Sequence, residues 1–188
     1  MRMAYIGMGG NLASWVGPPE ATLAAAAMRL ESLGHLICRS SLYSTEPVGF
    51  AAQPRFVNAV VGLETVLEPK ELLHNLLAIE KKFGRDRAAG VRNSPRTLDL
   101  DILLFGEHEI SEPGLEIPHP RLAERAFVLI PLNEIAPEVV VPGCGKTVSQ
   151  LLSSQVPPPR RTRTGAASCE SDAVVRVQSD AWEARTRI

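Results

Sequence analysis

The most constraining feature of the sequence is the segment Pro-Arg-Thr-Leu-Asp-Leu-Asp-Ile-Leu-Leu-Phe at 95–105, where two aspartates alternate with apolar residues. Because side chains on a strand point to opposite faces with a period of two, Asp99 and Asp101 should share one face, with the apolar residues packed behind them. Strands disfavour aspartate, so an acidic pair in an apolar run needs compensating positive charge. The segment therefore predicts a strand that presents two carboxylates to a bound metal ion or to positively charged side chains.

The loop before this strand supplies positive charge. Its glycines and proline interrupt any helix, and it carries four arginines: Arg85, Arg87, Arg92 and Arg96. Mg²⁺ in proteins commonly takes one or two carboxylates together with substrate phosphates, and guanidinium groups bind phosphate oxygens. An isolated Asp-x-Asp pair would indicate a solvated strand edge, but this arginine-rich surrounding favours a metal and polyphosphate site.

Composition limits the class of protein. A chain of 188 residues is long enough for one domain with its own core. Its net charge of −1 provides no field that would attract nucleic acid or an anionic membrane. The three cysteines are scattered without C-x-x-C spacing, no apolar run is long enough to span a bilayer, and the first residues do not form a signal peptide. We therefore expect a cytoplasmic protein with neither nucleic acid nor membrane as partner.

Apolar periodicity and turn residues predict strands at 3–8, 36–44 and 56–65, helices at 20–33 and 69–83, and then the aspartate-bearing strand. The order is strand, helix, strand, strand, helix, strand. This is the βαββαβ order of the ferredoxin-like α+β fold, an antiparallel sheet with helices packed against it.

The character of the chain changes after residue 152. Three prolines at 157–159 precede an arginine cluster and a mixed segment with little periodicity. We expect residues 1–152 to form the domain and 153–188 to be a flexible Pro/Arg-rich extension outside the fold, with a strand at 174–177 as a minor alternative.

Several polar and aromatic residues allow two interpretations. Asn58 lies between apolar residues of an expected strand, where an amide needs a partner, and Phe56 and Phe127 are core residues by default. The three could instead sandwich a flat heterocycle and bind its edge. His119 in Ile-Pro-His-Pro is either structural or, with Arg125, a contact for polyphosphate.

Taken together, the segments resemble the 6-hydroxymethyl-7,8-dihydropterin pyrophosphokinase family of folate biosynthesis. The matching pieces occur in family order over roughly residues 3–142, and the run Arg-Thr-Leu-Asp-Leu-Asp is highly specific. They are Ala4–Leu12, Tyr43–Gly49 with Gln53, Phe56 and Asn58, Ile79–Glu80, Gly84–Arg87, Pro95–Ile102, and Ile117–Pro120 with Arg125 and Phe127.

The resemblance implies an enzyme that transfers the diphosphate of ATP to the hydroxymethyl group of the pterin and releases AMP, with two Mg²⁺ ions as cofactors. We expect the protein to be a monomer. Catalysis would rest on charge stabilisation and positioning. The implied catalytic residues are Arg85, Arg96, Asp99 and Asp101, of which the two aspartates would bind the metal ions. The implied pterin site comprises Asn11, Thr45, Pro47, Val48, Phe56, Asn58 and Phe127. The implied ATP site comprises Glu80, Arg87, Arg92, Ile102, His119 and Arg125.

Two alternatives stay open. Asn93 stands where the family usually carries tryptophan, which leaves a non-catalytic pterin- or nucleotide-binding relative as the second hypothesis. A nucleic-acid-binding ferredoxin-like domain that uses the arginine-rich tail is the third. It lacks the basic balance and the aromatic sheet that RNA-binding modules use.

Overall fold

The computed structural model describes residues 1–47, 53–85, 94–155 and 174–183, so Val48, Arg87, Arg92 and Asn93 lie outside the described residues. The strands are β1 (Arg2–Gly10), β2 (His35–Arg39), β3 (Leu42–Thr45), β4 (Phe56–Thr65), β5 (Asp99–Phe105), β6 (Ile110–Glu112), β7 (Leu115–Ile117), β8 (Val140–Val141), β9 (Lys146–Thr147) and β10 (Val175–Val177). The helices are α1 (Pro19–Leu30), α2 (Pro69–Lys82), α3 (Ala126–Ile135), α4 (Val148–Gln155) and α5 (Asp180–Glu183), with 3-10 turns η1 (Glu31–Leu33) and η2 (Leu122–Glu124).

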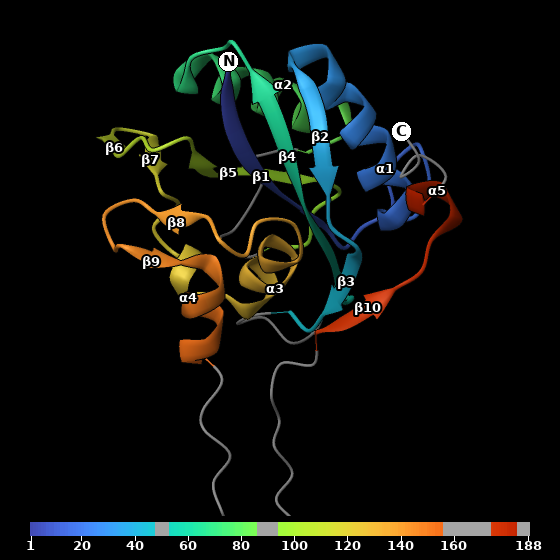
Figure 1. Cartoon of the computed structure of the whole chain (residues 1–188). Coiled ribbons are helices and arrows are strands. Elements are labelled where there is room, and N and C mark those ends of the chain that lie inside the picture. The colour runs from blue at the N-terminus through green and yellow to red at the C-terminus, as the bar shows by residue number, and fades with distance from the viewer. Residues whose placement is uncertain (48–52, 86–93, 156–173, 184–188) are drawn as a thin grey trace, which may run out of the picture.

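One antiparallel sheet organises the molecule (Figure 1). Its order is β10-β3-β4-β1-β5, and β2 pairs with β4 as well. Helices α1 and α2 contact one face of the sheet, whereas α3 packs on β3 and β4 from the other face. The expected ferredoxin-like α+β fold is confirmed.

Local sequence explains where the two large helices begin. Pro19 and Pro69 each occupy the first helical position, where the missing N–H group costs nothing. In α2 the apolar residues Leu72, Leu76 and Ile79 recur at helical spacing and are buried. Among the helices of the described residues, none combines the length and apolar character needed to cross a membrane.

Strand β4 separates the two cores. Its residues 57, 59, 61 and 63 face the core formed with α1 and α2, and Val60 faces the core formed with α3 and α4. This alternation follows from the period of two along a strand. Phe56 and Asn58, near the start of the strand, point to the α3 side and line cavities there.

The single strand expected at 36–44 is two strands in the structure. Arg39 lies opposite Val61 and Tyr43 lies opposite Asn58. The four residue steps from Arg39 to Tyr43 therefore lie opposite three residue steps of β4, so one residue is extra. Ser40 accommodates the extra residue: its N–H donates to Val60 O at 2.9 Å and its Oγ accepts from Val60 N at 3.0 Å. The bulge bends the chain and aims β3 at the site described below.

The C-terminal region also differs from the sequence-based expectation. Helix α4 continues through Gln155, past the expected boundary at 152. Residues 174–183 are not an extension outside the fold, because β10 pairs with β3 and Trp182 of α5 is only 3% exposed. Pairing satisfies the open edge of β3, and burial of Val177 and Trp182 supplies the apolar contact that holds the segment in place.

Close approach at the end of β1 requires glycine at position 10. A Cβ atom there would lie 2.4 Å from the backbone oxygen of Thr97. We expect Gly10→Ala to lower the free energy of unfolding by about 1–3 kcal/mol, because backbone must move to admit the methyl group. Denaturant unfolding measures this.

Gly7→Ala is the matched control on the same strand. Its Cβ would meet the flexible end of the Leu103 side chain at 3.2 Å, so a smaller loss is expected. Equal losses for the two variants would contradict the assignment of the backbone contact as the cause.

Candidate functional site

The acidic pair lies on the α3 face of β5, as its alternation predicts. Asp99 and Asp101 line a cavity beneath α3, while Leu100 and Ile102 are buried in the core on the opposite face. Across the ladder, Asp99 faces Gly9 and Asp101 faces Gly7 of β1. Because directly opposed residues point to the same side, the two glycines place no side chain of their own beside the carboxylates.

Arginines hold the Asp99 carboxylate from two sides. Arg85 pairs with its Oδ1, and Arg96 Nε lies 3.0 Å from its Oδ2. Arg85 also donates to Glu80 Oε1 at 2.9 Å and to Leu98 O at 3.1 Å. Burial by itself lowers the pKa of Arg85, but the combined effect of Asp99, Glu80 and Asp101 raises it, so this guanidinium stays charged.

Glu80 of α2 stabilises this arrangement. Its side chain is only 1% exposed, and its Oε1 accepts the N–H of Leu100 at 2.8 Å as well as the bond from Arg85. The structure thus places Glu80 behind the acidic pair, where it orients Arg85 and the start of β5, and not on the cavity surface.

The Asp101 carboxyl group has a raised pKa. Burial, then repulsion by Asp99 and Glu80, raises its pKa from 3.8 to about 6, against the opposing effect of Arg125 and Arg85. The site therefore favours an additional positive charge at this carboxylate. The described residues contain no cluster of three or more His, Cys, Asp or Glu side chains suited to a metal ion. Two carboxylates that complete their shell with substrate or water oxygens fit Mg²⁺.

A larger cavity adjoins the acidic pair. Thr45, Phe56, Asn58 and Phe127 line it, and Asn58 Nδ2 donates to Thr45 Oγ1 at 2.8 Å. The guanidinium of Arg96 lies 5.0 Å from the Phe56 ring centre. The structure thus brings both predicted aromatics and the predicted amide together around one space.

The two cavities meet at a shared boundary. Asn58, Arg96, Arg125 and Phe127 line both of them. Because Asp99, Asp101 and His119 line only the smaller cavity, a ligand in the larger one would reach the acidic pair past two guanidinium groups.

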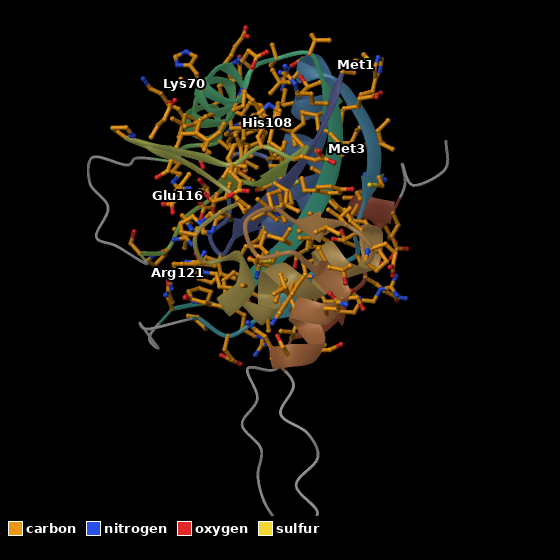
Figure 2. The ribbon with its side chains drawn as sticks, turned by 60° about the vertical axis from the view of Figure 1, so that its left-hand side comes forward. Met1, Met3, Lys70, His108, Glu116 and Arg121 are labelled. Atoms are coloured by element: carbon orange, nitrogen blue, oxygen red, sulfur yellow. The ribbon has the colours of Figure 1, made fainter. Side chains whose placement is uncertain are left out.

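His119 and Arg125 form one side of the smaller cavity, with His119 next to β5. The His119 N–H donates to Leu103 O at 2.9 Å, and His119 Nδ1 accepts from the N–H of Arg121 at 3.1 Å. Burial, and then Arg125 and Arg121, lower the pKa of His119, which keeps the imidazole neutral at neutral pH. Figure 2 shows Arg121 at the left-hand edge of the molecule, below Glu116. This side suits an anionic ligand.

The remaining predicted residues take varied positions. Asn11 braces two loops: its Nδ2 donates to Gln53 Oε1 at 3.2 Å and to Pro54 O at 3.1 Å, and its Oδ1 accepts from Arg96 N at 2.8 Å. Pro47 is half-buried, two residues after Thr45. The Ile102 side chain is 5% exposed in the core on the far face, so the expectation that it contacts ATP does not hold for its side chain.

Sequence reasoning missed part of the cavity lining. The missed residues of the larger cavity are Glu46, Arg121, Glu124, Ala126 and Val174. Arg121 lies between His119 and Arg125 in the sequence, and this position could have identified it as a cavity residue. Val174 gave none, because it reaches the cavity only through strand pairing with β3.

Comparison with known proteins identifies the family to which this chain is similar. A family model described as 7,8-dihydro-6-hydroxymethylpterin-pyrophosphokinase (HPPK) matches residues 5–137. A Pseudomonas aeruginosa protein named 2-amino-4-hydroxy-6-hydroxymethyldihydropteridine pyrophosphokinase is 44% identical over 82% of this chain and 92% of its own. A Bacillus subtilis protein of the same name is 43% identical over 73% of this chain and 80% of its own. A crystal structure of Plasmodium falciparum HPPK-DHPS, 18% identical with a TM-score of 0.67, matches 82% of this chain but only 45% of its own, and shows the shared fold.

The raised pKa of Asp101 predicts that its ionised carboxylate destabilises the folded protein when no metal ion is bound. Folding favours the protonated acid, so the stability cost is absent below the ordinary pKa of 3.8 and is complete above about 6. We expect Asp101→Asn to raise the melting temperature of the metal-free protein at pH 8 by several degrees, and by less at pH 5.

Thermal unfolding by circular dichroism in the presence of a chelator measures this effect. Glu31→Gln, at an exposed position after α1, is the control and should leave the melting temperature unchanged at both pH values. An Asp101→Asn protein that melts below the parent at pH 8 would show that the carboxylate is stabilising.

Proposed function

The chain belongs to the 7,8-dihydro-6-hydroxymethylpterin-pyrophosphokinase family, and we propose on that basis that it transfers the diphosphate of ATP to 6-hydroxymethyl-7,8-dihydropterin in folate biosynthesis, with release of AMP. The observation that supports this most directly is the junction of two cavities. One offers aromatic faces and an amide, and the other offers an acidic pair and guanidinium groups.

The larger cavity is the proposed pterin site. Phe56 and Phe127 provide faces for a flat ring, and the Asn58 amide can bind its edge. Among the described residues, the Asn58 amide donates one N–H to Thr45, which leaves its second N–H and its oxygen for the heterocycle. Asn11 contributes by fixing the loops at Gln53 and Arg96. Pro47 and Val48 remain predictions for this site.

Asp99 and Asp101 are the proposed ligands of two Mg²⁺ ions. Bound Mg²⁺ supplies Lewis-acid stabilisation of phosphate charge and a template for in-line displacement. Arg96 flanks Asp99 and lines both cavities, so its guanidinium is placed to bind the diphosphate that is transferred. Arg85 holds Asp99 from the other side, and its contact with the phosphates stays a prediction. Glu80 acts by orienting Arg85. The residues supply charge stabilisation and positioning, so the proposal needs no dedicated base.

His119 and Arg125 are the proposed ATP contacts among the described residues. A neutral imidazole beside charged guanidinium groups can accept or donate without adding repulsion. Arg87 and Arg92 stay predictions for this site, and Ile102 could contribute through its backbone alone. The monomeric state and the cytoplasmic location also stay predictions.

A coupled assay of AMP formation tests the function. We expect AMP only when ATP, the hydroxymethyldihydropterin and Mg²⁺ are all present. Asp99→Ala and Asp101→Ala should each lower kcat by at least about 100-fold, because each removes charge that binds the metal ions. Circular dichroism would check that the variants fold.

Glu31→Ala is the control for removing an exposed carboxylate and should leave kcat unchanged. Near-normal turnover in either aspartate variant would contradict the metal assignment. Tight ATP binding without any AMP formation would instead support the non-catalytic relative raised by Asn93.

Arg96→Ala tests the proposed role in transfer. Its guanidinium stands at the junction of both cavities, so we expect kcat to fall about 100-fold while KM for ATP changes by less than about threefold. Arg29→Ala, on the exposed side of α1, is the matched control. A change confined to KM would show that Arg96 binds substrate without favouring the transition state.

A further inference from the structure

The segment 174–183 lies beyond the family match at 5–137 and still reaches the candidate site. Strand β10 pairs with β3, with Val175 opposite Ser44 and Val177 opposite Leu42. Figure 1 shows β10 along the outer edge of β3 and α5 beside α1. Val174, the residue before β10, lines the larger cavity together with Thr45 and Phe127.

Trp182 anchors this segment. Its side chain is 3% exposed, its Nε1 donates to Ser40 O at 2.9 Å, and the Arg39 guanidinium lies 5.1 Å from its ring centre. Ser40 is the bulge residue that directs β3 toward the cavity. The anchor therefore holds the same stretch of chain that delivers Thr45.

A carboxylate on α3 joins the three elements that form the wall. Glu134 accepts from Ser41 N at 2.8 Å and from the Tyr43 hydroxyl at 2.9 Å, and it lies 3.9 Å from Arg176 of β10. Burial and the bond to Glu134 raise the pKa of Tyr43 to about 12, so its hydroxyl remains a donor. Each joined element contributes to the cavity lining: Thr45 from β3, Ala126 and Phe127 from α3, and Val174 immediately before β10.

We propose that Val174 forms an apolar wall of the pterin site and that Trp182 positions it; this rests on the proposed function. An apolar side chain there excludes water from the edge of the ring and disfavours charged or bulky ring substituents. Val174 does not line the smaller cavity with the acidic pair, so it sets pterin affinity and not the rate of transfer.

Two adjacent valines of the full-length chain provide a matched test. Val174→Asp places a carboxylate in the cavity, whereas Val175→Asp places one at a position that is 54% exposed. We expect Val174→Asp to raise KM for the pterin at least tenfold, with kcat and KM for ATP within about twofold of the parent. Val175→Asp should match the parent, and Trp182→Ala should raise KM for the pterin at least threefold.

Calorimetric titration with 6-hydroxymethyl-7,8-dihydropterin separates the two proposals. Loss of pterin affinity in Val174→Asp alone supports the wall even if turnover is absent from the parent, which would overturn only the proposed function. Equal affinities in both valine variants overturn the wall, whether or not AMP forms. If Trp182→Ala does not fold, the valine pair decides the question. A parent chain that binds no pterin would overturn both.

Discussion

The site depends on one buried carboxylate. Glu80, at the end of α2, binds the backbone of β5 at Leu100 and the guanidinium of Arg85, which in turn holds Asp99. Such a buried group is stable only while its partners remain, since an unpaired charge in the interior is costly. Helix, loop and strand are therefore fixed relative to one another before any ligand binds. This fixed geometry holds Asp99 and Asp101 on the same face of β5.

Placing like charges together has a cost that the surroundings offset only in part. Burial and the neighbouring acids work against ionisation of Asp101, although Arg85 and Arg125 reduce the effect. The result is a site with negative charge at the acids and positive charge at the guanidinium groups. A metal-bound polyphosphate carries both kinds of charge, which is the chemistry of the proposed reaction.

Much of this could be predicted from local pattern. Strand alternation placed Asp99 and Asp101 on one face and separated the faces of β4, because a period of two depends on the backbone alone. The break at Ser40 and the docking of Trp182 were not predicted. Each depends on which distant strand or helix packs against the residue, and short-range periodicity contains no such information.

The glycines at positions 7 and 9 have a consequence for how this site can change. They make the floor of the smaller cavity bare peptide, whose N–H and C=O groups belong to the ladders with β4 and β5. A Cβ at Gly9 would come within 2.8 Å of Asn58 Oδ1, and a Cβ at Gly7 would lie 3.2 Å from the Leu103 side chain, so a larger residue at either position requires a neighbouring side chain to move. Changes in ligand preference are therefore accommodated more readily at the rim, where loops and the C-terminal segment meet, than at this part of the base.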